Sequence, residues 1–232
     1  MTAMPALEIL ASSGLGSLLG LRHAFEPDHL AAVSTLASHE RSGIRGAFLG
    51  LFWGAGHTLA LVLVGAVLVV MQTEMPPGAA TLFELLVAVM LVGLGVRAIR
   101  QAAQQGPSGP DRVHRHGRVV HRHAGMPAHV HVGTWTFARR PLLVGIVHGL
   151  AGTGALTALV LTTLPSTGAR LMYMVQFGVS STLGMAVLSG FLGWRLAKLG
   201  AHHAVCRVLS FAVGCLSTVL GVLWGYSAYA RF

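Results

Sequence analysis

Six long apolar segments alternate with short polar ones along the 232-residue chain. A membrane-spanning helix needs about 20 consecutive apolar residues, and five of the six segments reach that length without interruption. The segment nearest the N-terminus contains Pro27, which cannot donate a backbone hydrogen bond to the carbonyl of His23. We therefore predict an all-α integral membrane protein of about six transmembrane helices, the first of them broken at Pro27. The apolar segments are 7–37, 46–71, 80–100, 141–164, 170–194 and 204–229.

The composition supports this placement in a membrane. Hydrophobic residues make up 53% of the chain and charged residues 10%, whereas soluble domains are about 25% charged. Little sequence remains for a soluble domain. The formal charge of +9 comes from residues in short loops, and no basic helix or aromatic-basic surface accompanies it, so nucleic acid is not an expected partner. Two cysteines, Cys206 and Cys215, give no disulfide framework.

The distribution of Lys and Arg predicts how the chain is oriented. With six spans, the loops 38–45, 101–140 and 195–203 share one side of the membrane. That side, with the helix ends bordering it, carries most of the 16 positive charges. Cytoplasmic loops carry such an excess of Lys and Arg. We expect a multi-pass protein of the cell membrane with both termini outside and the central loop in the cytoplasm.

The two halves of the chain resemble each other weakly. Gly20 and His23 recur as Gly145 and His148, and the glycine, threonine and leucine of the second span recur in the fifth, at offsets of 124–126 residues. Three spans per half is an odd number, so the second copy must be inverted in the membrane. Inverted repeats commonly place the substrate site at mid-membrane, where broken helices meet.

We accordingly divide the chain into a first three-helix repeat, 1–100, and a second, 141–232, joined by a His-rich loop, 101–140. Composition predicts that this loop is disordered and binds metal weakly, because H-x-H pairs put successive imidazoles within reach of one cation. It is either a low-affinity metal buffer or sensor, or a polar linker whose histidines do little. It lies outside the bilayer, so it is not the transport site. Its histidines are His114, His116, His121, His123, His129 and His131.

Candidate chemistry is concentrated at the break in the first segment. A charged side chain near the bilayer centre costs about 2.5–3.5 kcal/mol, so a cluster of ionisable groups there indicates a function. On an unbroken helix Asp28 and His29 would point roughly 140° and 240° away from His23. Only a break lets the three converge, and Pro27 supplies one. Imidazole suits nickel, cobalt, copper and zinc, and carboxylate adds a harder ligand. A structural polar network is the alternative.

Two further histidines lie within apolar segments. His57 lies near the middle of 46–71, where Gly54 and Gly56 let another backbone approach closely. His148 lies in 145–154, whose glycines weaken a helix and permit unwinding. Each is a candidate metal ligand or gate residue; the alternative is an interhelical hydrogen bond for the first and simple packing for the second.

Other polar residues are candidates for lining the path of an ion or supporting its ligands. Glu26 could bind the ion, carry a proton or pair with Arg22, which we expect to neutralise a carboxylate. The hydroxyl residues of the second half could instead only satisfy backbone carbonyls, as they often do in membrane helices. These are Thr153, at the position corresponding to Asp28, and Ser180 and Ser181, in the span that matches that of His57.

These motifs resemble those of the nickel/cobalt transporter superfamily. The first helix of that family carries the signature H-x4-D-H, met here by His23, Asp28 and His29. The pair Gly56-His57 resembles its second-span motif. Residues 145–154 resemble the G-x-x-H-G-x-x-G-(S/T) stretch of a shorter branch, which includes urease-accessory nickel permeases. The acidic motif of the longer, eight-span members has no counterpart in this chain.

The resemblance and the residues together imply a permease for Ni²⁺, and by extension Co²⁺, that works by alternating access and without a cofactor. We expect uptake, with the ion held at a mid-membrane site by His23, Asp28 and His29, and with His57 and His148 as ligands or gate residues. Membrane lipid and the ion are the expected partners, and a second copy of the chain is a further candidate.

Two alternatives stay open at this point. An efflux permease would use the same site in the opposite direction, and the cytoplasmic His-rich loop would gather metal for export. A membrane-embedded zinc hydrolase would need a stably bound metal with an open coordination position and a general base, for which Glu26 could serve. The inverted repeat and the lack of a second intramembrane motif of enzyme type speak against the hydrolase, so we do not expect an enzyme.

Overall fold

Helices dominate the computed structural model, and there is one for each of the five uninterrupted apolar segments. The structure describes residues 3–37, 42–104, 112–116, 119–123, 129–132, 135–199 and 203–231. The helices are α1 (Ala3–His23), α2 (Pro27–Ala37), α3 (Gly43–Met71), α4 (Pro77–Gln104), α5 (Arg139–Thr163), α6 (Thr167–Leu199) and α7 (His203–Tyr229).

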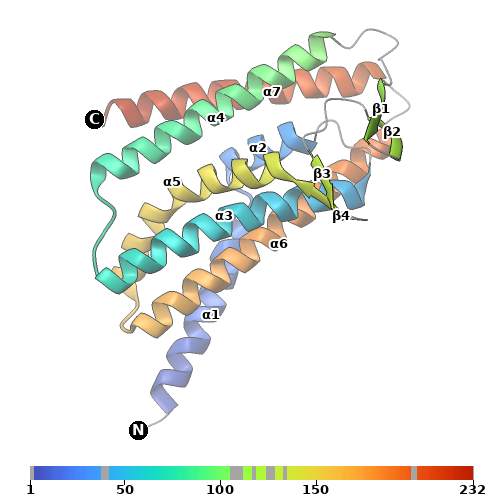
Figure 1. The fold of residues 1–232 in the computed structure, drawn as a ribbon. Coiled ribbons are helices and arrows are strands. Elements are labelled where there is room, and N and C mark those ends of the chain that lie inside the picture. The colour runs from blue at the N-terminus through green and yellow to red at the C-terminus, as the bar shows by residue number, and fades with distance from the viewer. Residues whose placement is uncertain are drawn as a thin grey trace.

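The helices form one bundle around α3, which packs between α5 and α6 (Figure 1). Helix α1 runs along the other side of α6, and α4 pairs with α7. The short helix α2 lies inside this arrangement and contacts α7, α6 and α4. The N-terminus and the C-terminus both lie at the end of the bundle opposite to the strands (Figure 1). Neighbours in the bundle are therefore often distant in the sequence.

Four of the described helices are long and apolar enough to cross a membrane, namely α3, α4, α6 and α7. Helix α5, which bends by 44° between Arg139–Thr153 and Ala155–Thr163, becomes a fifth if its two parts count as one span. The chain is thus a multi-pass membrane protein. The six predicted spans exceed this number by the first segment, which is divided into α1, of 21 residues, and α2, of only 11 residues or about 16 Å.

The predicted break of the first segment is confirmed, because α1 ends at His23 and α2 begins at Pro27. The carbonyl of His23, to which Pro27 cannot donate, accepts a hydrogen bond from the backbone N–H of Glu26 at 3.0 Å. Pro27 then occupies the first turn of α2, where a missing N–H costs nothing. This short connection places Asp28 and His29 on a new helix with a new direction.

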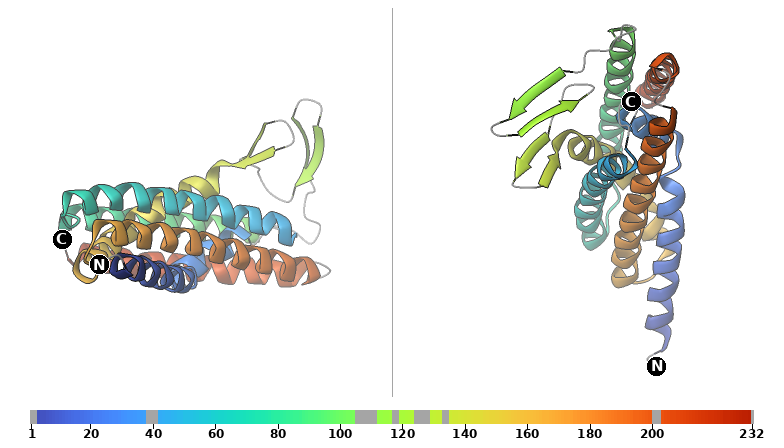
Figure 2. Two further views of the ribbon diagram at one scale, coloured as in Figure 1. Left: turned by 90° about the horizontal axis from the view of Figure 1, so that it is seen from below. Right: turned by 90° about the vertical axis from the view of Figure 1, so that its right-hand side faces the viewer.

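The central loop contains two short hairpins, although the sequence composition predicts disorder for it. Strand β1 (Arg112–His116) pairs antiparallel with β2 (Val119–His123), and β3 (His129–Val132) pairs with β4 (Trp135–Ala138). Both hairpins project from the helix bundle (Figure 2). These strands contain valine, threonine and aromatic residues, which favour strands. The side chains of this segment lie outside the described part of the structure.

Glycines set the distance between the helices that carry the site. Gly20 of α1 lies against the backbone of Phe177 on α6, where an added Cβ would come within 2.8 Å of the Phe177 Cα. Gly145 of α5 lies in the same way against the backbone of Trp53 on α3. Small residues at such contacts let membrane helices approach closely. The ends of α1 and α5 are thereby held against the central helices.

We predict that Gly20→Ala destabilises the protein by about 1–3 kcal/mol, because the new methyl group meets backbone that cannot move aside. Gly14 on the same helix is the matched control, since an added Cβ there has nothing within 4 Å. Gly14→Ala should leave stability unchanged or raise it by up to about 1 kcal/mol. Thermal unfolding of the detergent-solubilised protein measures both, and equal melting temperatures would contradict the close packing of α1 on α6.

Candidate metal centre

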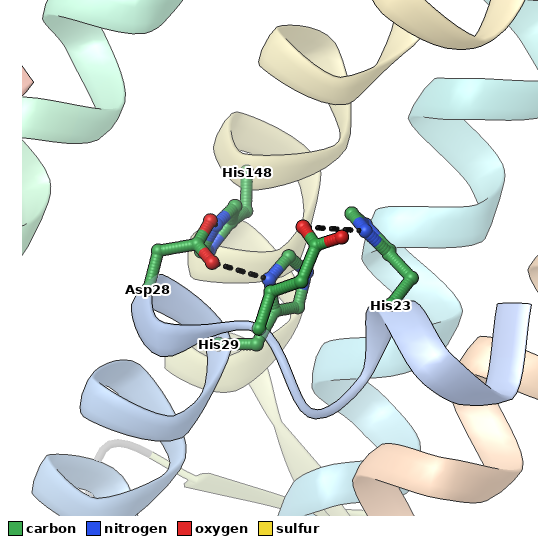
Figure 3. A network of polar contacts seen from close by, with 5 residues as sticks. His23, Asp28, His29 and His148 are labelled. Carbon is green, nitrogen blue, oxygen red and sulfur yellow. Dashed lines mark hydrogen bonds and ion pairs between the residues drawn. The ribbon is translucent and has the colours of Figure 1, made fainter. Parts of the chain in front are cut away.

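Four helices bring four histidines and one aspartate together inside the bundle. His23 lies at the end of α1, Asp28 and His29 lie in the first turn of α2, His57 lies in the middle of α3, and His148 lies on α5. Figure 3 shows His29 between Asp28 and His23. The aspartate and the histidines on α2, α3 and α5 are at most 5% exposed, and His23 is half-buried. All five residues that the sequence predicts as ligands or gate residues therefore lie in one cluster inside the bundle.

The Asp28 carboxylate accepts two hydrogen bonds from imidazoles. The Nδ1–H of His29 donates to one oxygen at 3.0 Å, and the Nε2–H of His148 donates to the other at 2.7 Å. A buried carboxylate is costly unless it is paired and hydrogen-bonded, and here both oxygens are engaged. The second bond joins residues 120 positions apart. Asp28 therefore ties α2 to α5 and fixes the orientation of both rings.

A second carboxylate holds His23. The Nδ1–H of His23 donates a hydrogen bond to a carboxylate oxygen of Glu26 at 2.9 Å, across the turn between α1 and α2. Glu26 is about half exposed, with 48% of its side chain accessible. It pairs with His23 and not with Arg22, whose side chain is exposed. Two of the three roles considered for Glu26, ion ligand and proton carrier, stay predictions.

Several imidazole nitrogens at this place are buried and have no hydrogen-bond partner among the described residues. A buried polar atom without a partner costs about 1–3 kcal/mol. Native proteins contain few of them, and a cluster calls for a functional explanation. The atoms are Nε2 of His23, Nε2 of His29, both ring nitrogens of His57 and Nδ1 of His148.

Two overlapping groups of side chains have ligand atoms close enough to hold one metal ion. In the described residues these are His23, His29 and His57, and Asp28, His29 and His148; within each group the ligand atoms lie within 4.8 Å of one another. His29 belongs to both. Its ring centroid lies 4.3 Å from that of His23, 5.3 Å from that of His57 and 4.2 Å from that of His148.

Aromatic side chains form the apolar surroundings of the cluster. The ring of Trp53 lies 5.4 Å from that of His29 and 5.8 Å from that of His148, and the ring of Phe177 lies 5.0 Å from that of His23. Neither residue is among the site residues that the sequence predicts. Trp53 precedes His57 by four positions and so shares its helix face, which was an available signal. Phe177 meets the site only through the packing of α1 on α6.

In the described structure, the other predicted residues make no hydrogen bond to the ring cluster. Thr153 donates its hydroxyl to the carbonyl of Gly149 at 2.8 Å, next to the bend in α5, and such bonds often accompany bent helices. Ser181 is fully buried, and its hydroxyl has no partner in the described residues, whereas Ser180 is half-buried. The side chains of the loop histidines lie outside the described structure; they are His114, His116, His121, His123, His129 and His131.

Comparison with known proteins gives one family and several relatives. The model of the family NicO, described as high-affinity nickel-transport protein, matches residues 10–231. The urease accessory protein UreH of Bacillus sp. (strain TB-90) is 31% identical over 228 residues, which cover 97% of this chain and 94% of that protein.

Two plant proteins are also similar. These are the chloroplast proteins FOR GROWTH AND FERTILITY 1 and 2 of Arabidopsis thaliana, at 28% and 26% identity over 189 and 188 residues. The matches cover 79% and 80% of this chain, but only 50% and 48% of the plant proteins. No solved structure shows significant similarity to the chain.

We predict that Asp28→Ala lowers the melting temperature of the metal-free protein, because two buried ring N–H groups lose their acceptor at about 1–3 kcal/mol each. Glu84→Ala is the control. It removes the carboxylate that pairs with Arg231 in an exposed contact, and exposed ion pairs contribute about 0–1 kcal/mol. Circular dichroism during heating in detergent compares the two. An unchanged melting temperature for Asp28→Ala would show that the carboxylate does not bridge the two rings.

Proposed function

The chain belongs to the NicO family of high-affinity nickel-transport proteins, and from this we propose that it is a membrane permease for Ni²⁺, with Co²⁺ as a second substrate. The observation that carries the proposal is a cluster of buried imidazole nitrogens inside the helix bundle that have no partner among the described residues. The ion is the substrate of the protein, and the proposed activity is transport without a catalytic step.

The donor set fits this class of ion. Imidazole nitrogen binds Ni²⁺, Co²⁺, Cu²⁺ and Zn²⁺ well, whereas Mg²⁺, Ca²⁺ and Mn²⁺ prefer oxygen. No thiolate contributes to either ligand group among the described residues, which disfavours Cu⁺. We propose that the five candidate ligands (His23, Asp28, His29, His57 and His148) replace part of the hydration shell of the ion. Geometry, and not raw affinity, must then select nickel or cobalt, since copper binds most such sites more tightly.

We further propose that the six predicted spans form two inverted three-helix repeats, 1–100 and 141–232. Support comes from contacts between the two halves that occur in equivalent form twice, once with each half supplying each of the two partners. Thr58 on α3 and Thr182 on α6 have their Oγ1 atoms 2.8 Å apart, and these residues occupy equivalent positions in the two halves. A contact between equivalent residues is expected where an approximate twofold axis passes between two helices. The α3–α6 pair would then lie on this axis.

The glycine contacts agree with the same axis. Gly54 faces Thr182, and its counterpart Gly178 faces Thr58. Likewise, the packing of Gly20 on Phe177 has its counterpart in the packing of Gly145 on Trp53 (contacts described above). The broken pair α1–α2 and the bent helix α5 would therefore be equivalent elements, which face each other across the histidine cluster.

This arrangement supports alternating access by rocking of one repeat against the other. The hydrogen bond from His148 to Asp28 crosses from the second half to the first. A rocking movement would break that bond and open the cluster, and the two repeats would exchange their conformations. Inverted repeats in other transporters place their substrate sites at such interfaces.

For orientation we propose a cytoplasmic central loop and external termini. The described ends of α2, α3, α4, α5, α6 and α7 that border the arginine-rich connections gather at one end of the bundle, and the chain termini lie at the other (Figure 1). The positive-inside tendency then assigns the first end to the cytoplasm. The loop histidines at that end would serve as a weak metal buffer or sensor.

We predict that His23→Ala, Asp28→Ala and His29→Ala each reduce Ni²⁺ flux into proteoliposomes to the level of empty vesicles, because each change removes a polar group that the dehydrated ion or its ligands need. Glu84→Gln, whose carboxylate pairs with Arg231 and not with the cluster, should keep wild-type flux and serves as the control. A metal-sensitive dye inside the vesicles reports the flux. Full flux in all three variants would rule out the cluster as the transport site.

We predict that loss of the protein impairs nickel-dependent enzymes of its host when nickel is scarce, because high-affinity transport is useful mainly for uptake. Growth and intracellular nickel content at limiting and at excess nickel are the measurements, and a complemented strain is the control. If the deletion strain instead accumulates nickel and becomes sensitive to it, the same site works in export.

A further inference from the structure

We propose that the ion is held by the three imidazoles of His23, His29 and His57, and that the carboxylates of Glu26 and Asp28 position two of these rings without binding the ion. The proposal rests on the proposed transport function and goes beyond it. It differs from the ligand set His23, Asp28 and His29 that the sequence motif favours. Glu26 and Asp28 become positioning residues.

The hydrogen bonds fix which ring nitrogen is available on His23 and His29. A carboxylate oxygen only accepts, so the nitrogen facing it must carry the proton. Glu26 faces Nδ1 of His23 at 2.9 Å, and Asp28 faces Nδ1 of His29 at 3.0 Å. In each ring the lone pair of the neutral imidazole is therefore on Nε2. Both Nε2 atoms are buried and unpartnered in the described structure.

A pairing of this kind is the usual support of a metal-binding histidine. Such histidines almost always donate the second ring N–H to a carboxylate, a carbonyl or water, which fixes the tautomer and raises the basicity of the ligand. The chain supplies it twice within seven residues, from Glu26 and from Asp28, on either side of the break at Pro27. The break at Pro27 thus positions two imidazoles, those of His23 and His29, each oriented by a carboxylate, and Asp28 is not a third ligand.

His57 completes the set. Its side chain is fully buried, and neither ring nitrogen has a partner in the part of the chain that the structure describes. Its ring centroid lies 5.3 Å from that of His23 and 5.3 Å from that of His29, which are themselves 4.3 Å apart. An ion about 2.1 Å from two imidazole nitrogens separates their centroids by about 4.6–5.3 Å at ligand angles of about 90–109°. The three rings are close to that arrangement.

The second group of candidate ligands is engaged differently. Both oxygens of Asp28 already accept N–H groups, from His29 and from His148. An ion that took the place of these two hydrogen bonds would have to displace the N–H protons from Nδ1 of His29 and Nε2 of His148. In this conformation the group is a closed hydrogen-bond network, and His148 connects the two halves of the protein without being a ligand.

An all-nitrogen site has consequences for selectivity. Oxygen-preferring cations such as Mg²⁺, Ca²⁺ and Mn²⁺ gain little from three imidazoles, whereas Ni²⁺ and Co²⁺ gain much. The two carboxylates supply negative charge near the site without offering a hard oxygen ligand. Excess Mg²⁺ or Mn²⁺ should therefore not displace Co²⁺ from the protein.

Binding of Co²⁺ and Ni²⁺ to the purified full-length protein in nanodiscs tests the assignment. The visible spectrum of bound Co²⁺ reports the ligand set, and X-ray absorption of bound Ni²⁺ counts the imidazoles. We expect three imidazoles in the wild type. His57→Ala should lower the count or abolish binding, whereas His148→Ala should keep three.

The two carboxylates give the sharper comparison. Asp28→Asn and Glu26→Gln should each raise the Kd for Co²⁺ by about 10–100-fold and leave the spectrum of the saturated protein unchanged. Glu84→Gln is the matched control and should change neither quantity. Glu26 is half exposed, so Glu26→Gln tests the positioning role even if Asp28→Asn does not fold. A changed spectrum in the folded Asp28→Asn variant would make Asp28 a ligand and overturn the proposal.

The remaining outcomes separate this inference from the proposed function. If His148→Ala loses an imidazole and His57→Ala keeps all of them, the ion sits in the other group and the assignment is wrong, although the transport function stands. If the wild type neither binds Ni²⁺ nor conducts it into proteoliposomes, the transport function itself fails, and this assignment fails with it.

Discussion

A buried carboxylate with two imidazole donors is the constraint on which the rest of the structure depends. Asp28 lies in the interior of an apolar helix bundle, where an unpaired charge would be very costly. It is tolerated because His29 and His148 donate to its two oxygens. To make both bonds, α2 must start at the right place and α5 must come close. The helix break at Pro27 and the glycines of α5 serve these two requirements.

The glycines act on the site through the backbone. Gly145 and Gly149 lie so close to the backbone of α3 that an added Cβ would come within about 3 Å of main-chain atoms of His57 or Trp53. This contact brings His148 to Asp28 and places the ring of Trp53 5.8 Å from that of His148. Five imidazole nitrogens of the cluster are buried and have no partner among the described residues. Unpaired buried nitrogens are costly, and in a member of a nickel-transport family this cost agrees with our proposal that the cluster binds the transported ion.

Much of the architecture was readable from the sequence because it depends on local pattern. Long apolar runs have few ways to satisfy their backbone in lipid, so each becomes a helix, and the five uninterrupted segments do so. Pro27 breaks the first segment for a reason that concerns only its own missing N–H. The H-x4-D-H motif and the isolated His57 and His148 marked the candidate site before any contact was known. For the central loop the composition predicts disorder, whereas its β-branched and aromatic residues favour the short strands of the structure.

The contacts between distant segments were decided only by the tertiary structure. The sequence indicated that His23, Asp28 and His29 could converge. It did not indicate that both oxygens of Asp28 would accept hydrogen bonds, from His29 and His148. Nor did it indicate that Glu26 would pair with His23 and not with Arg22. Those choices depend on which helices lie side by side, and a sequence pattern of period 3.6 identifies a face without naming its partner. The residue types and the break were therefore determined by the chain itself, whereas the partner of each polar atom was set by helix packing.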